Sequence, residues 1–266
     1  MGALAVQDEA FGDLLRSWRQ RRRVSQLDLG IEAEVSARHI SFLETGRARP
    51  SREMVMRLAE ELDVPLRHRN RLLVSAGFAP VFREREVRAP EMDAVRQALD
   101  RILAGHEPYP AVVVDAAWNL VAANAAAGMF MEGVPEELLT EPVNVMRLSL
   151  HPEAMGGKLV NLAEVRAYAL SQLRRQADAS GDARLAELHD EIAGYAYPGV
   201  ELNVAHVPGP GDILIPMRIR HGDRILSMFT TIATFGSPLD VTVSELAIET
   251  FWPGDEETAA LFQRSP

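Results

Sequence analysis

The sequence predicts two domains, an all-α domain of five helices followed by an α+β domain with an antiparallel sheet. Its 266 residues suit two compact units, since a domain typically takes about 150 residues. Apolar residues recur at helical spacing over about the first 75 residues, with short connections between the periodic runs. The remainder begins and ends in β-rich runs with amphipathic helices between them, which is typical of an α+β domain.

Each of the five N-terminal helices has its own start or stop signal. The first carries an apolar stripe from Phe11 to Trp18. The fifth is expected to begin at Pro65, because proline suits the first helical position. Gly30 inside the second helix implies that another helix crosses closely, since glycine otherwise costs helix propensity. The N-cap candidates of the second, third and fourth helices are Ser25, Ser36 and Ser51.

The second domain follows a charged, proline-bounded linker over residues 79–91. Its predicted elements are a helix at 92–103, a hairpin of strands at 111–115 and 118–123, helices at 125–131, 159–177 and 182–195, and strands at 212–220, 224–234 and 245–251. Asn124 is expected to cap the helix that follows it.

The composition excludes several classes of function. The chain contains no cysteine, which rules out disulfides and thiolate metal or redox sites. Its histidines show no metal-ligand spacing, and no nucleophile, phosphate-loop or dinucleotide motif occurs. We therefore expect no catalytic residue, no metal and no required cofactor. No apolar run approaches the roughly 20 residues of a transmembrane helix, so we expect no membrane association. The lack of cysteine makes the reducing cytoplasm the expected location.

The charge is distributed unevenly along the chain. Residues 1–88 contain 16 arginines against 13 acidic residues, whereas residues 89–266 carry a net charge of −13. A basic first part on an acidic body indicates that only the first part binds a polyanion. An arginine-rich, solvated helix face would give the same local charge.

A stretch of the first domain resembles a known DNA-binding motif. The residues from Ser25 to Ser51, including Val35-Ser-Ala-Arg-His-Ile-Ser-Phe-Leu-Glu-Thr-Gly46, resemble the XRE-type helix-turn-helix of phage repressors, and the resemblance covers residues 12–64. It implies that the helix at 36–44 enters the major groove of DNA. It also implies an ion pair between Arg19 and Glu44. Glu34 departs from the family pattern, because the turn often has glycine there.

The same resemblance implies a set of DNA contacts. Those with base edges fall to Ser36, Ala37, Arg38 and Ser41, with Phe42 against a thymine methyl group, and those with phosphates fall to Gln26, Arg47 and Arg49. For Arg38, a phosphate contact or a free surface charge is the open alternative. For the whole segment, the alternative is a helical bundle that contacts another protein.

Over about residues 10–263 the chain resembles the MmyB/MltR-like regulators, in which an XRE-type head precedes a PAS-like ligand-binding domain. The resemblance rests on sequences such as Trp118-Asn-Leu-Val-Ala-Ala-Asn124 and Phe251-Trp-Pro-Gly-Asp255. It implies a helix-turn-helix domain at 10–78, a PAS-like domain at 92–263, and a homodimeric transcription regulator whose pocket holds a long-chain fatty acid. An XRE-type repressor or antitoxin whose second domain binds a protein partner is the alternative, and an enzyme with a DNA-binding head is a third class.

The pocket would need an apolar lining and a partner for any charged end of its ligand. The candidate lining residues are Met129, Phe130, Met217, Met228, Phe229 and Ile232, although each taken singly is more typical of a core. Arg147 lies among apolar residues and needs either an anionic ligand or an internal acid, the acid being favoured. Asn124 and Arg218 are the further candidates for the ligand's polar end, and Arg218 faces the pocket in only one of two strand registers.

Overall fold

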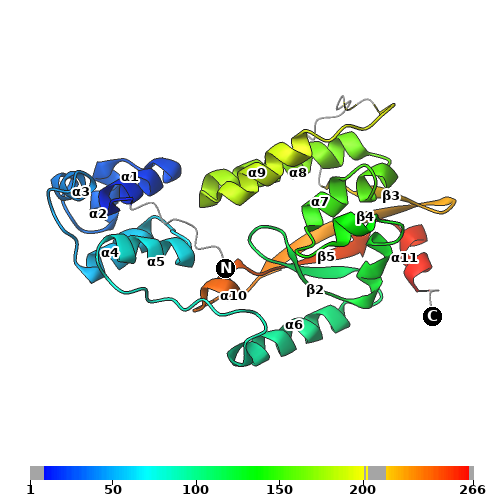
Figure 1. Ribbon diagram of the computed structural model, residues 1–266, viewed down its shortest axis with the longest axis horizontal. Coiled ribbons are helices and arrows are strands. Elements are labelled where there is room, and N and C mark those ends of the chain that lie inside the picture. The colour runs from blue at the N-terminus through cyan, green and yellow to red at the C-terminus, as the bar shows by residue number, and fades with distance from the viewer. Residues whose placement is uncertain (1–8, 201, 203–213, 264–266) are drawn as a thin grey trace. The chain divides into compact units, whose positions relative to one another are not determined.

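The computed structural model describes residues 9–200, 202 and 214–263, and the chain divides into two compact units (Figure 1). The first unit extends to Arg85 and also contains Ser237–Ser244, which follows it by some 150 residues in the sequence. The second unit contains Glu86–Gly236 and the chain from Glu245 onward. Each unit has its own hydrophobic core.

The first unit contains the five expected helices. They are α1 (Phe11–Arg22), α2 (Gln26–Glu32), α3 (Ala37–Glu44), α4 (Arg52–Glu61) and α5 (Leu66–Ser75). All three predicted serine caps are confirmed, since each side chain accepts a hydrogen bond from a backbone amide three residues on, at 3.1–3.2 Å. A Cβ on Gly30 would lie 2.7 Å from the carbonyl oxygen of Val35. The close approach predicted at Gly30 is therefore made mainly by the turn between α2 and α3.

The predicted linker is partly ordered by α5 and by the distant segment 237–244. Asn70 of α5 accepts hydrogen bonds from the amides of Val81 and Phe82, at 3.0 Å each. Further along the linker, Arg85 Nη1 lies 2.7 Å from Asp240 Oδ2, and the Val241 amide donates to the Arg83 carbonyl oxygen at 2.8 Å. These contacts explain why Ser237–Ser244 belongs to the first unit.

The second unit is built on a five-stranded antiparallel sheet in the order β2-β1-β5-β4-β3. The strands are β1 (Ala111–Val114), β2 (Leu120–Ala123), β3 (Met217–His221), β4 (Arg224–Thr234) and β5 (Ala247–Pro253). The predicted fold class is confirmed: a five-helix unit precedes a mixed α/β unit with an antiparallel sheet. The predicted strand at 212–220 begins later, and its residues 212–213 lie outside the described residues.

Helices cover the two faces of the sheet, as Figure 1 shows. The α helices of this unit are α6 (Asp93–Gly105), α7 (Val145–Leu150), α8 (Leu162–Ser180), α9 (Ala183–Ala193) and α11 (Glu256–Phe262), while α10 (Val241–Glu245) connects β4 to β5; the 3₁₀ helices are η1 (Pro90–Met92), η2 (Ala125–Phe130), η3 (Glu136–Leu139) and η4 (Met155–Lys158). One face packs with α7, α8 and α9 in the large core, and the other packs with α6 in a smaller one. The helix expected at 125–131 is thus the 3₁₀ helix η2.

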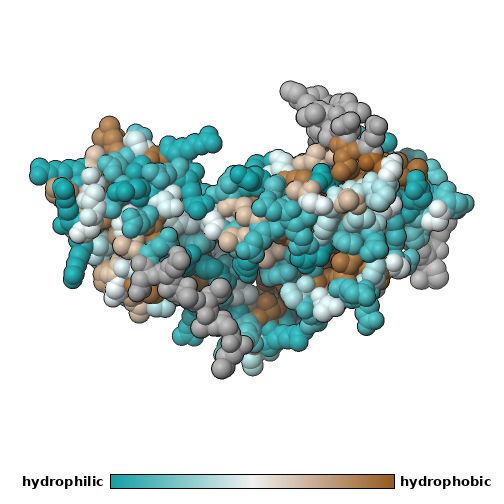
Figure 2. Space-filling model, turned by 45° about the horizontal axis from the view of Figure 1, so that its top comes forward, coloured by the Kyte–Doolittle hydropathy of each residue, from teal (hydrophilic) through white to brown (hydrophobic). Residues whose placement is uncertain are grey.

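Most of the surface seen in Figure 2 is hydrophilic, with hydrophobic residues in small clusters. Within the described residues, no helix is both long enough and apolar enough to cross a membrane.

Candidate functional site

The outward face of α3 carries the predicted base-reading residues. Ser36 and Arg38 are exposed, while Ala37, Ser41 and Phe42 are half-buried. The opposite face of α3 packs into the core of the first unit through Ile40 and Leu43. The side chains at the start of α3 are therefore free of the core.

Three arginines lie on or next to this outward face of α3. The Arg38 guanidinium lies over the Phe42 ring, 5.1 Å from its centroid, so the two side chains form one surface. Arg47 and Arg49, the predicted phosphate contacts, are exposed in the loop that follows α3. The charge of this region is thus available to a polyanion.

A buried acidic group joins three helices beneath this face. Glu44 accepts hydrogen bonds from Arg19 at 2.6 and 3.0 Å and from the Gln26 amide nitrogen at 2.8 Å, and Arg16 lies 3.4 Å away. Burial alone would raise the pKa of Glu44, but the hydrogen bonds from Arg19 and Gln26 and the charge of Arg19 lower it below its ordinary value. The expected Arg19–Glu44 ion pair is confirmed. Gln26, expected at a phosphate, is directed toward Glu44.

The turn between α2 and α3 adopts the backbone conformation that its family pattern implies. Glu34 has a φ of 55°, in the left-handed region that favours glycine. Arg57 of α4 supports this turn, donating to the Ala33 carbonyl oxygen at 3.2 Å and lying 3.5 Å from the Glu34 carboxylate. Arg57 has no recognisable signal in the sequence.

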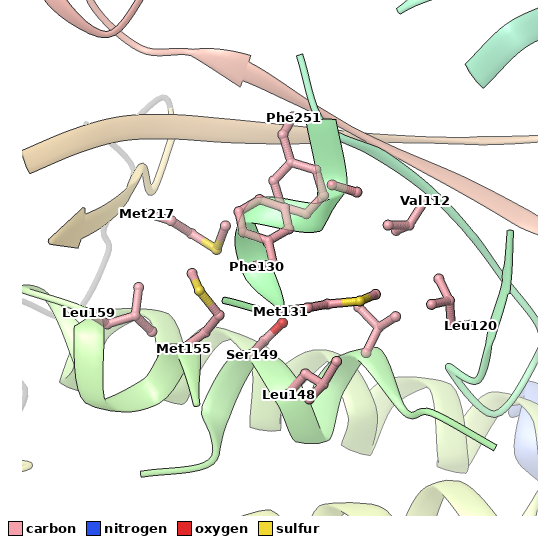
Figure 3. Close-up of a pocket in the computed structure, with 12 residues that line it drawn as sticks. Val112, Leu120, Phe130, Met131, Leu148, Ser149, Met155, Leu159, Met217 and Phe251 are labelled. Carbon is pink, nitrogen blue, oxygen red and sulfur yellow. The ribbon is translucent and has the colours of Figure 1, made fainter. Parts of the chain in front are cut away.

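An apolar cavity of about 40 Å³ lies in the second unit between the sheet and α7. Figure 3 shows Phe130, Phe251, Met131, Met155 and Met217 converging on it. The rings of Phe130 and Phe251 are 4.7 Å apart. The rest of the lining is Val112, Leu120, Ala127, Val145, Leu148, Ser149 and Leu159, in which Ser149 is the one polar residue. Two predicted ligand residues, Phe130 and Met217, thus line it.

A second cavity of about 290 Å³ shares Val145, Ser149 and Met217 with the first. It extends over β4 and β5 toward α8 and is more polar. Its further lining includes Met146, Leu150, Val165, Tyr168, Ala169, Gln172, Ile215, Thr230, Ile232 and Glu249. Of the predicted ligand residues, Met217 and Ile232 line this cavity. Burial raises the pKa of Glu249 to about 7, against a smaller lowering by its hydrogen bond with Thr230.

Sequence reasoning missed Glu249. It is the one acidic residue in the otherwise uncharged run Leu246-Ala-Ile-Glu-Thr-Phe-Trp252. A charged residue within a strand that packs on both faces is the signal that could have identified it.

Arg147 forms an ion pair with Glu191, an acidic residue of the same chain. Its Nε and Nη2 donate to the two carboxylate oxygens of Glu191 on α9, at 2.7 Å each, and Tyr195 donates to the same carboxylate at 2.6 Å. The hydrogen bond and charge of Arg147 lower the pKa of Glu191. Arg147 lines neither cavity. The acid partner favoured from the sequence is therefore the one present.

The other candidates for the ligand's polar end also have structural partners. Asn124 caps η2 as predicted: it accepts hydrogen bonds from the Ala111 and Ala127 amides and donates to the Tyr109 carbonyl oxygen at 2.7 Å. Arg218 is exposed and lies 3.8 Å from Glu164, so β3 has the register that directs it to solvent.

The remaining predicted lining residues lie elsewhere in the second unit. Met228 is fully buried in the core. Phe229, the next residue, points to the opposite face of the sheet and pairs with Trp252 on β5. Met129 lines a separate, wider hollow of about 620 Å³ between η2, the β3–β4 turn and α11. None of the three lines the two adjoining cavities.

Within the described residues, no group of three or more histidine, aspartate or glutamate side chains is arranged to hold a metal ion.

Residues 95–264 match a family described as the MmyB-like transcription regulator ligand binding domain, and residues 10–72 match a helix-turn-helix domain family. These are families of transcription regulators, not of enzymes. No curated protein matches the chain. Among solved structures, the clp gene regulator ClgR from Corynebacterium glutamicum is 26% identical, with 38% of this chain and 94% of that chain covered and a TM-score of 0.23.

Proposed function

This chain belongs to the family of transcription regulators with an MmyB-like ligand-binding domain, and from that premise we propose that α3 reads operator DNA under the control of an apolar ligand in the second unit. The observation that carries the proposal is the apolar cavity between sheet and helices, since a regulator that responds to a ligand needs a place to bind it. The outward face of α3 supplies the other half of the function.

On the DNA side, the exposed Arg47 and Arg49 would neutralise phosphates, while Arg38 reaches a base edge. The helix-turn-helix unit of one protomer covers only one half-site of an operator. A homodimer would therefore bind a pseudo-palindromic operator whose half-sites are about 34 Å apart. Such a regulator acts where the chromosome lies, in the bacterial cytoplasm.

On the ligand side, the lining suits a hydrocarbon chain, such as that of a long-chain fatty acid. Each buried CH₂ group of the chain would contribute about 0.8 kcal/mol. Three of the lining residues are methionines, and their unbranched side chains can change rotamer to widen a small cavity. For the ligand to regulate, it must bind the DNA-competent and incompetent states unequally.

The test begins with organic extraction of the purified full-length protein and mass spectrometry of the extract. We expect a compound with a long hydrocarbon chain, and we expect its addition to change operator affinity measured by fluorescence anisotropy. The variant Ser149→Phe should remove both effects, because Ser149 lines both cavities. Ala94→Phe, on the exposed side of α6, is the matched control. Absence of any bound compound, with operator affinity unaffected by added lipids, would favour a protein partner for the second unit.

A further inference from the structure

The larger cavity contains a carboxyl group whose polar partners are all uncharged. Glu249 lies on β5 opposite Ile232 of β4, and both side chains line the cavity. Thr230, two residues along β4, lies on the same face of the sheet and also lines the cavity. Glu249 is half-buried and lines the cavity.

The other polar groups of the two cavities cannot neutralise this carboxylate. They are the hydroxyls of Ser149, Tyr168 and Thr230 and the amide of Gln172. Within the part of the chain that the structure describes, no lysine, arginine or histidine lines either cavity. A carboxylate in apolar surroundings without a cation is costly, and the raised pKa of Glu249 reflects that cost.

Resting on the proposed ligand-binding function, but in place of the fatty acid given there as an example, we propose that the ligand carries a protonated amine at one end of its hydrocarbon chain and that Glu249 binds this amine. An ammonium group provides both the missing positive charge and donors for the carboxylate oxygens. The chain would then extend past Val145, Ser149 and Met217, which the two cavities share, toward Phe130 and Phe251. A fatty-acid carboxylate in the same place would meet a second carboxyl group and no cation.

Three probes with the same chain length separate the end group from the chain. They are dodecylamine, dodecan-1-ol and dodecanoate, the two ions used below their critical micelle concentrations and the alcohol below its solubility limit, with affinity for the full-length protein measured by calorimetry. We expect the amine to bind at least tenfold more tightly than dodecanoate, with the alcohol between them.

Glu249→Gln should weaken amine binding at least tenfold, leave the alcohol within about threefold and strengthen dodecanoate, because it removes the charge with little change of shape. Glu187→Gln, an exposed position on α9, controls for non-specific attraction of the amine to an acidic protein. It should change none of the three affinities. The thermal midpoint of Glu249→Gln should not fall, since a neutral amide avoids the cost of the buried charge.

Each adverse result has a distinct meaning. Tighter binding of dodecanoate than of the amine to the wild-type protein would overturn the inference, and this comparison requires no variant. An equal loss of all three probes in Glu249→Gln would also overturn it. If none of the probes binds, including the alcohol, the proposed ligand-binding function itself is wrong.

Discussion

Arg147 and Glu191 join α7 to α9 through two parallel hydrogen bonds of 2.7 Å each. Both side chains are more than one third exposed, so solvent screens the pair, although its two-bond geometry is favourable. The role that this geometry supports for Arg147 is to hold two helices together.

We therefore expect Arg147→Ala to lower the free energy of unfolding by about 0.5–1 kcal/mol while leaving the affinity for dodecan-1-ol unchanged. Urea denaturation of the single variants and of Arg147→Ala with Glu191→Ala completes a double-mutant cycle. The double variant should lose less than the sum of the two. A loss of ligand affinity without a loss of stability would return Arg147 to the list of ligand contacts.

Glu44 gives the protein a defined dependence of stability on pH. Its pKa is lowered in the folded state, so its contribution is present above the unfolded pKa of about 4.3 and is lost as the pH falls through the folded value. We expect Glu44→Gln to cost about 2–3 kcal/mol at pH 7. The difference from wild type should shrink as the pH falls from 7 toward 3, because the contribution of the charged carboxyl is lost below the unfolded pKa. Urea denaturation at both pH values measures this, with the exposed Glu60→Gln as control. A difference that stays constant between the two pH values would contradict this origin.

Replacing Glu34 with glycine should stabilise the protein, because the backbone conformation at this position favours glycine. A non-glycine residue in the left-handed region costs about 1–2 kcal/mol, while glycine costs about 0.5–1 kcal/mol more unfolded-state entropy. Losing the exposed contact with Arg57 has little effect. Glu34→Gly should thus stabilise the protein by about 0.5 kcal/mol, seen as a higher thermal midpoint. Glu32→Gly, in the last residue of α2, should lower the midpoint, and equal effects of the two substitutions would refute the explanation.

The arginines near α3 should differ in what their loss does to DNA binding. Arg38→Ala should cost about 1–3 kcal/mol on the operator and relax the preference at one base pair. Arg47→Ala and Arg49→Ala should weaken operator and random DNA alike, and each should reduce the slope of log affinity against log salt by about 1. Anisotropy titrations on both DNAs at several salt concentrations measure these effects. If Arg38→Ala weakens both DNAs equally, Arg38 contacts a phosphate.

We expect a homodimer at micromolar concentration, bound to two half-sites separated by about one helical turn. Sedimentation velocity of the free protein and footprinting of its complex test the two parts. A monomer on a single asymmetric site would contradict the prediction.

Local chemistry explains which features could be predicted from the sequence. The serine caps and the cap at Asn124 depend on residues three positions away, so the local pattern contains what determines them. The partner of Arg147 lies 44 residues further on and that of Asp240 lies 155 residues back, distances that no local pattern reports. The direction of Arg218 depended on strand register, which the pairing of β3 with β4 fixes.

The position of Ser237–Ser244 limits how this regulator can be recombined with its relatives. The segment is attached at both ends to strands of the ligand-binding domain, yet it belongs with the chain up to Arg85. A chimera that takes its DNA-binding domain from one relative and its ligand-binding domain from another would combine residue 85 of one parent with residue 240 of the other. The ion pair between Arg85 and Asp240 would survive such an exchange only if both parents carried compatible residues at the two positions. Modular exchange of heads should therefore succeed when the Ser237–Ser244 insert is transplanted with the head, and fail more often when the cut follows the linker alone.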